Sequence, residues 1–133
     1  MKIANDELVD HFNALTTLAG RRLGKDIGLV VFGCMLAMRS AAENYTKDQA
    51  LIDAAFATAT EHAAADATAL QEAAKIRDEC LQELLKREVE IPDLGTPLNP
   101  ELLIAKDVEP IYCIRLRLLC SPLQPITPAP AQG

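Results

Sequence analysis

Thiol and imidazole side chains, which can act as nucleophiles, bases or metal ligands, are few in this chain and widely spaced. The sulfur and imidazole groups belong to four cysteines and two histidines: Cys34, Cys80, Cys113, Cys120, His11 and His62. A structural zinc site needs closely spaced ligand pairs such as C-x-x-C, and a cysteine nucleophile needs an identifiable base beside it. The sequence therefore predicts no metal site. Cys34 and Cys80 fall on apolar helical faces, where we expect small buried hydrophobic side chains.

Oxygen-bearing side chains do not complete a catalytic site either. Carboxylates gather between Glu72 and Glu83, but a di-iron site in a helical bundle needs Glu-x-x-His motifs, which this chain lacks. The two serines, Ser40 and Ser121, stand outside any Gly-x-Ser-x-Gly motif. Segment 20–26 is one residue shorter than a phosphate-binding loop and ends in Asp where Ser or Thr is needed. We therefore expect a protein that is not an enzyme and carries no cofactor.

The acidic charge is concentrated in the middle of the chain. The 133 residues carry a formal charge of -6 at pH 7, and residues 41–93 hold twelve acidic and five basic side chains. This acidic stretch is typical of a solvated helical surface, with partner binding as the less favoured alternative. Because phosphate backbones attract basic surfaces, we expect no nucleic-acid partner. Half of the residues are hydrophobic, which is too many for a disordered chain.

The sequence also predicts neither a membrane span nor an export signal. Residues 27–38 form an uncharged run, but its twelve residues fall short of the roughly 20 that a span requires. The N-terminal residues are polar and acidic, whereas a signal peptide begins with a basic segment followed by a hydrophobic one. We therefore expect a cytoplasmic protein without a membrane partner.

Apolar residues at helical spacing predict three helices, at about 6–19, 22–62 and 67–87. Asn5 is the expected N-cap of the first helix and Gly20 its stop. No glycine or proline occurs between Gly33 and Pro92, although one small domain requires a turn there. Two sites compete: a capping box at 46–49, and the stretch around 61–66, where Asp66 could cap the next helix. We favour the second, because the apolar stripe runs through 46–49 with little change of phase.

Glycines near the start of the second helix allow two interpretations of equal weight. Gly20, Gly24 and Gly28 recur at every fourth position, and Gly33 follows. In a continuous helix this spacing forms a smooth groove in which another backbone can approach closely. Alternatively, the chain forms a loop through Gly24 and the later glycines are merely tolerated.

The C-terminal third changes character. Asn99 and Pro100 predict the start of a short helix through about Ala105. Alternating side chains predict strands at 88–91 and 111–119, which we expect to pair with each other. The predicted fold is mainly α: an antiparallel helical hairpin with a short N-terminal helix, a small C-terminal two-stranded β element and an extended proline-rich tail. The expected divisions are a helical domain at 1–92, an appendage at 93–121 and a tail at 122–133.

Two short stretches resemble a loose group of small proteins from tailed phages and prophages. These stretches are the opening Met1-Lys-Ile-Ala-Asn5-Asp-Glu-Leu8 and the segment from Glu83 to Pro92. Proteins of this group run through a helical hairpin into a short extended segment and are encoded among virion or tail modules. The alanine-rich middle of this chain departs from the group, which has a Gly/Asp-rich hairpin turn. The resemblance implies a role in the virion or tail and assigns no functional residue.

These observations predict a non-catalytic assembly protein, a phage virion or tail component that binds copies of itself or other virion proteins. The expected contact surface is strand 111–119 together with the C-terminal tail, because an unpaired strand can extend a partner's sheet. Its predicted partner-binding residues are Ile111, Ile114, Leu116, Leu118, Arg115 and Arg117. The alternative is a small regulatory or ligand-binding helical protein acting on a cellular partner, with a pocket near Met35, Met38 and Phe56.

Overall fold

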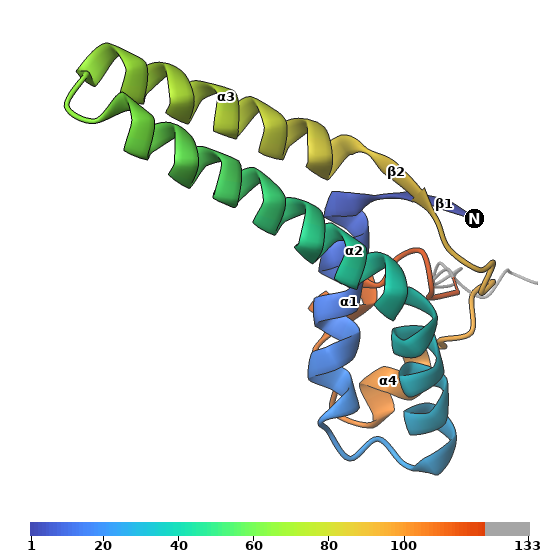
Figure 1. Ribbon diagram of the computed structural model, residues 1–133. Helices are drawn as coiled ribbons and strands as arrows, with labels where there is room; N and C mark the ends of the chain where they lie inside the picture. The colour runs from blue at the N-terminus through green and yellow to red at the C-terminus, as the bar shows by residue number, and fades with distance from the viewer. Residues whose placement is uncertain (122–133) are drawn as a thin grey trace, which may run out of the picture.

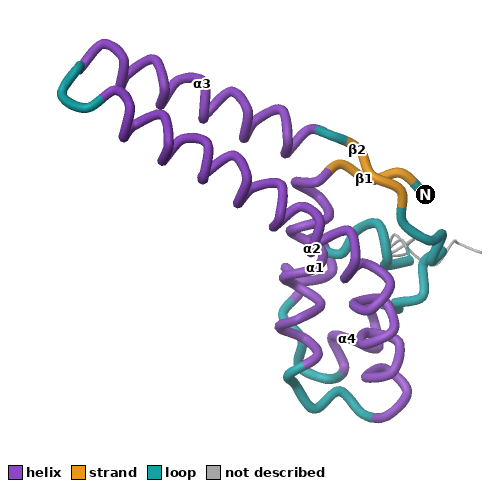
Figure 2. The backbone as a smooth tube through the Cα atoms, viewed as in Figure 1, coloured by secondary structure: helices purple, strands orange, loops and turns teal. Residues whose placement is uncertain are grey.

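The computed structural model describes residues 1–121, and the predicted tail at 122–133 lies outside the described residues. The prediction of a mainly helical protein is confirmed, and the described residues also contain a small two-stranded antiparallel sheet. Two long helices lie side by side and extend away from the rest of the chain (Figures 1 and 2). We call residues 48–83 the arm, and the remaining described residues the base.

Helix α1 (Asn5–Ala19) lies in the base and ends at Gly20, as predicted. The predicted N-cap is wrong by one residue, because Ala4 occupies that position. The Asn5 side chain is instead buried, and its Nδ2 donates a 2.9 Å hydrogen bond to the carbonyl of Leu84. Asn5 thus satisfies a carbonyl in the last turn of another helix, where intrahelical partners run out.

Helix α2 (Lys25–Ala63) begins in the base and continues into the arm. It starts three residues later than predicted, because Gly24 precedes it with φ 86°, a backbone conformation that favours glycine. A Cβ placed at Gly28 or Gly33 would meet nothing within 4 Å, so no backbone packs closely against either residue. The loop interpretation of the glycines is therefore correct. Where α2 leaves the base, it changes direction (Figure 1) and Thr46 Oγ1 donates to the carbonyl of Ala42, a contact that often bends helices.

Helix α3 (Ala67–Lys86) follows a tight turn at residues 64–66, the favoured one of the two predicted sites. Asp66 caps α3 as predicted, since its Oδ1 accepts 3.1 Å hydrogen bonds from the backbone N–H groups of Thr68 and Ala69. The Asp66 N–H in turn donates to the carbonyl of Ala63 at 3.0 Å. Ala64 has φ 50° and ψ -118°, the angles of the first central residue in a type II′ turn.

Replacement of Ala64 by glycine should stabilise the protein by about 1 kcal/mol, because glycine adopts positive φ without the steric penalty of a Cβ. Urea denaturation followed by circular dichroism measures the change. Ala65→Gly is the matched control, since Ala65 has no positive φ and the substitution only adds flexibility to the unfolded chain. Equal effects of the two substitutions would contradict the turn geometry.

Strands β1 (Lys2–Ala4) and β2 (Glu88–Glu90) form the antiparallel sheet, with Ile3 opposite Val89. The predicted strand at 88–91 therefore exists, but its partner is the N-terminal segment rather than residues 111–119. The pairing places the start of α1 beside the end of α3, and the N–H of Asn5 donates to the carbonyl of Arg87 at 3.0 Å.

The predicted strand at 111–119 is wrong, because helix α5 (Pro110–Arg115) and turns occupy this segment. Pro110 stands in the first turn of α5, where its fixed φ favours a helix and its missing N–H costs nothing. The short helix α4 (Pro100–Ala105) begins as predicted, with the Asn99 side chain accepting from the N–H of Glu101. Leu98 and Cys120 then form an isolated bridge.

The N-terminal and C-terminal parts of the base share one hydrophobic core. Buried side chains of the N-terminal region, such as Leu8, Leu15 and Met38, pack in the same cluster as those of the C-terminal region. The C-terminal members of this cluster are Leu98, Leu103, Val108, Cys113, Leu116, Leu119 and Cys120. Residues 93–121, predicted as an appendage, thus share the core of the helices instead of forming a separate unit.

Candidate functional site

The structure separates the six residues predicted to bind a partner. Ile111 and Ile114 remain exposed, at 54% and 63%. Leu116 is fully buried in the core, and Leu118 is half-buried against it. Because α5 and the following turn replace the strand, Ile114 and Leu116 do not share a face. The predicted edge for sheet extension is therefore absent from residues 111–119.

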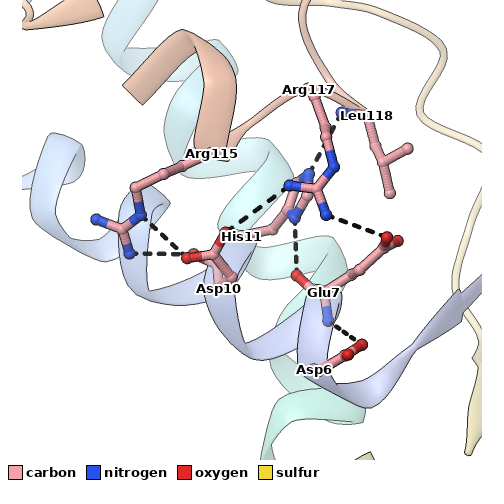
Figure 3. A network of polar contacts seen from close by, with 7 residues as sticks. All are labelled: Asp6, Glu7, Asp10, His11, Arg115, Arg117 and Leu118. Carbon is pink, nitrogen blue, oxygen red and sulfur yellow. Dashed lines mark hydrogen bonds and ion pairs between the residues drawn. The ribbon is translucent and has the colours of Figure 1, made fainter. Parts of the chain in front are cut away.

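Arg115 and Arg117 are engaged within the chain (Figure 3). Arg115 Nε donates to Asp10 Oδ1 at 3.0 Å, and Arg117 donates to Glu7 Oε1 at 3.1 Å. Half-exposed ion pairs of this kind contribute about 0–1 kcal/mol each. These two arginines attach the end of α5 and the turn after it to the polar side of α1, which is a structural role within the base.

His11, for which the sequence predicted no role, also holds the turn after α5 against α1. Its ring is fully buried, its Nδ1 lies 2.7 Å from the carbonyl of Glu7, and its Nε2 lies 3.3 Å from the N–H of Leu118 (Figure 3). The carbonyl accepts and the Leu118 N–H donates, so the ring is neutral with its proton on Nδ1. Burial lowers the pKa of His11 below its usual 6.5, and the nearby Arg117 charge lowers it further.

Three of the four thiols are buried in the base. Burial raises the pKa of Cys34 and Cys113, and it raises that of Cys120, whose thiol lies beside Cys113, to about 11. A raised pKa suppresses the thiolate that attacks electrophiles. Cys80 differs, because it is only half-buried and lies in the arm. The prediction of a buried side chain therefore holds for Cys34 and only partly for Cys80.

Cys80 should be alkylated by iodoacetamide well before the other three cysteines of the native protein. Mass spectrometry of intact protein and peptides should find one fast modification at pH 8, and four after unfolding. The fast phase should vanish in Cys80→Ser. Rapid modification of Cys113 or Cys120 in the native state would contradict the packing of the base.

The arm has fewer buried side chains than the base. None of residues 43–83 is buried, although Ile52, Phe56 and Leu70 are half-buried. Two helices pack against each other along one stripe only, so the sides of that stripe stay accessible unless a third element covers them. Among residues 1–121, no other element lies along the outer part of the arm (Figure 1).

An apolar groove of about 510 Å³ runs between the two helices of the arm. Its lining residues come from both helices: Ile52, Ala55, Phe56 and Ala59 of α2, and Ala69, Glu72, Ala73, Ile76, Arg77 and Cys80 of α3. The small alanines leave the groove open, and Ile76 is 51% exposed beside them. We call this feature the arm groove. The sequence signal for it was the alanine-rich stretch 41–74, whose side chains are too small to fill the space between two helices.

An ion pair and a cation–π contact, both made by Arg77, join the two helices of the arm. Arg77 Nε lies 3.1 Å from Asp53 Oδ1, and the Arg77 guanidinium stacks over the Phe56 ring at 5.1 Å. Of the side chains that line the arm groove, Arg77 is the basic one, and Asp53 offsets its charge. Glu72 supplies a carboxylate at the rim.

The pocket expected near Met35, Met38 and Phe56 is not formed. Met38 is fully buried in the base, whereas Phe56 lies in the arm, eighteen residues further along α2. At 1.5 Å per residue this separation amounts to about 27 Å. The two regions therefore cannot surround one small ligand.

The described residues contain neither a cluster of metal ligands nor a membrane-spanning helix. Within residues 1–121, no three His, Cys, Asp or Glu side chains are grouped closely enough to hold a metal ion. No helix in this part of the chain combines the length and apolar character needed to cross a membrane. Comparisons with protein-family models, with curated proteins and with solved structures found no match to this chain.

Proposed function

We propose that this chain is a non-catalytic protein–protein interaction protein, and that it binds its partner through the arm groove. The observation that carries the proposal is an apolar groove that the described residues leave uncovered. Apolar grooves between helices are a recurring docking site for amphipathic helices of other proteins. The antiparallel helical hairpin of α2 and α3 is then the recognition element, and the base holds the two helix ends together.

The resemblance to small phage and prophage proteins supports a role in virion or tail assembly in the host cytoplasm. Such a role needs a surface that docks on another protein and does not need a catalytic site. Ile111 and Ile114, two of the residues predicted from the sequence, remain exposed on the base and available for a second contact. The small-ligand alternative has less support, because ligand sites enclose most of their ligand, whereas the arm groove is open along the arm.

Photo-crosslinking tests the proposal in cells that make the protein. A benzophenone-bearing phenylalanine replaces Ala59 in the groove in one variant, and Ala54 in the other. Both residues are exposed on α2, but Ala54 does not line the groove. We expect a discrete crosslinked protein from position 59 and none from position 54. Equal crosslinking from both positions, or none from position 59, would contradict the proposal.

A further inference from the structure

We propose that the occupant of the arm groove is an amphipathic helix of another protein, apolar on one face and bordered by Lys and Arg. This inference rests on the proposed function and specifies the chemistry of the partner. The geometry of the groove and the charge of the arm support it separately.

The shape of the groove fits a helix. On α3 its lining runs from Ala69 to Cys80, which is about 16 Å, or three helical turns. Alanines on both walls permit a close approach, since helix axes pack 8–10 Å apart when small side chains meet. A partner presenting apolar residues at i, i+3, i+4 and i+7 would place them against Ile52, Phe56 and Ile76. The arm and its partner would then form a three-helix bundle.

The charge of the arm selects a basic partner. Residues 48–83 hold eight acidic and two basic side chains, a net charge of -6, whereas the acidic and basic side chains of all other residues cancel. The arm therefore carries the whole net charge of the chain. On α3, three glutamates lie one or two turns from the exposed Ile76 on the same side of the helix: Glu72, Glu79 and Glu83.

The arm holds two basic side chains that could offset these three glutamates. Arg77 is paired with Asp53 across the two helices, and Lys75, which lies three residues after Glu72 and four before Glu79, can offset only part of the charge of the three carboxylates. Lys or Arg residues flanking an apolar stripe would thus meet carboxylates at the rim, which favours both the encounter and the orientation of the partner.

The same charge disfavours other occupants. Two copies of the arm would bring together two surfaces of charge -6, and like charges placed side by side oppose association. Anionic lipid surfaces attract basic segments and repel an acidic arm. A second copy and a membrane are therefore outcomes that the test must separate from a basic helix.

Fluorescence anisotropy with two synthetic peptides tests the inference on the full chain. Both peptides are helix-forming and about 15 residues long, with leucines at i, i+3, i+4 and i+7. One carries Lys beside the leucines and the other carries Glu at the same positions. We expect the Lys peptide to bind at least about tenfold more tightly, because like-charge contacts are costly. The difference should shrink when ionic strength rises from about 0.01 M to 0.15 M and the Debye length falls from about 30 Å to 8 Å.

Two arginine substitutions on α2 control for the added charge. Ala55→Arg fills the groove, while Ala54→Arg adds the same charge one residue away, about 100° around the helix. Both sites are exposed, and arginine is a good helix former, so both variants should fold. Ala55→Arg should weaken binding of the Lys peptide by about tenfold or more and Ala54→Arg by less than about threefold, since only the first obstructs the groove.

The outcomes separate this inference from the proposed function. If both peptides bind equally and Ala55→Arg still weakens them, the basic character of the partner is wrong while the protein-binding function stands. If the two arginine variants behave alike, or if neither peptide binds, both proposals are overturned. Light scattering on the same samples detects a second copy in the groove, which would also overturn the inference.

Discussion

Leu116→Ala should destabilise the protein by about 2–5 kcal/mol, the range for removing a buried leucine side chain from a packed core. Leu116 is 0% exposed and belongs to the cluster that joins both ends of the chain. Ile114→Ala is the matched control, because Ile114 is 63% exposed and substitutions at exposed positions change stability by about 0.5 kcal/mol or less. Urea denaturation of the three proteins measures both effects.

This pair of variants distinguishes helix α5 from the strand that the sequence predicts. In a strand, Ile114 and Leu116 share a face, so truncating either one would have similar consequences. In the structure one lies in the core and the other in solvent. Similar losses of stability for the two variants would contradict the described packing of residues 110–120.

Lowering the pH below about 6.5 should decrease the free energy of unfolding, because His11 is fully buried. Its pKa in the folded protein lies below 6.5, so below about pH 6.5 the unfolded chain binds a proton that the buried ring resists. The free energy of unfolding therefore decreases as the pH falls from about 6.5 towards the folded-state pKa, and this part of the stability is fully present at higher pH. Protonation of Nε2 would also place two donors face to face, because Leu118 N–H already points at that nitrogen.

Replacement of His11 by leucine should remove this part of the pH dependence. It should also cost about 1–3 kcal/mol at pH 7.5, the penalty for leaving a buried donor such as the Leu118 N–H without an acceptor. His62→Gln is the control, since His62 is exposed near the end of α2. Denaturation curves between pH 5 and 8 measure both effects. An unchanged pH profile in His11→Leu would contradict the role assigned to His11.

Helical periodicity and capping residues were sufficient to predict most of the helical framework. Asp66 and Asn99 cap helices as predicted, because their side-chain oxygens accept hydrogen bonds from backbone N–H groups. Helix α1 also ends at Gly20 as predicted, although Gly20 has φ -82°, which does not require glycine. The pairing of β2 was not predictable in this way. Its partner, residues 2–4, lies far away in the sequence, and a three-residue strand carries too little alternation to reveal its partner.

The segment 111–119 shows why short patterns mislead. Ile114, Leu116 and Leu118 alternate as in a strand, yet Cys113, Leu116, Leu119 and Cys120 also recur at spacings of three and four. Only the second set is buried. Pro110 at the first helical position was the local signal for a helix. The correct choice depended on the core contributed by α1 and α2, which a local pattern does not contain.

The candidate site was missed for a related reason. The alanine-rich stretch was correctly read as helical, but nothing in the periodicity says whether a third element covers the pair of helices. The structure supplies that information, because none of residues 43–83 is buried. The acidic charge of the middle region was interpreted from the sequence as solvated surface, and in our proposal it is the property that favours a basic partner.

The solution mass of the purified chain, measured by light scattering over a concentration series in reductant, tests the central claim most directly. If the arm groove binds a different, basic protein, it stays uncovered in the isolated chain. We therefore expect a monomer of 14.4 kDa at every concentration and at both low and high salt. A dimer that forms as concentration rises, and that Ala55→Arg dissociates while Ala54→Arg does not, would show that the chain covers the groove with its own second copy.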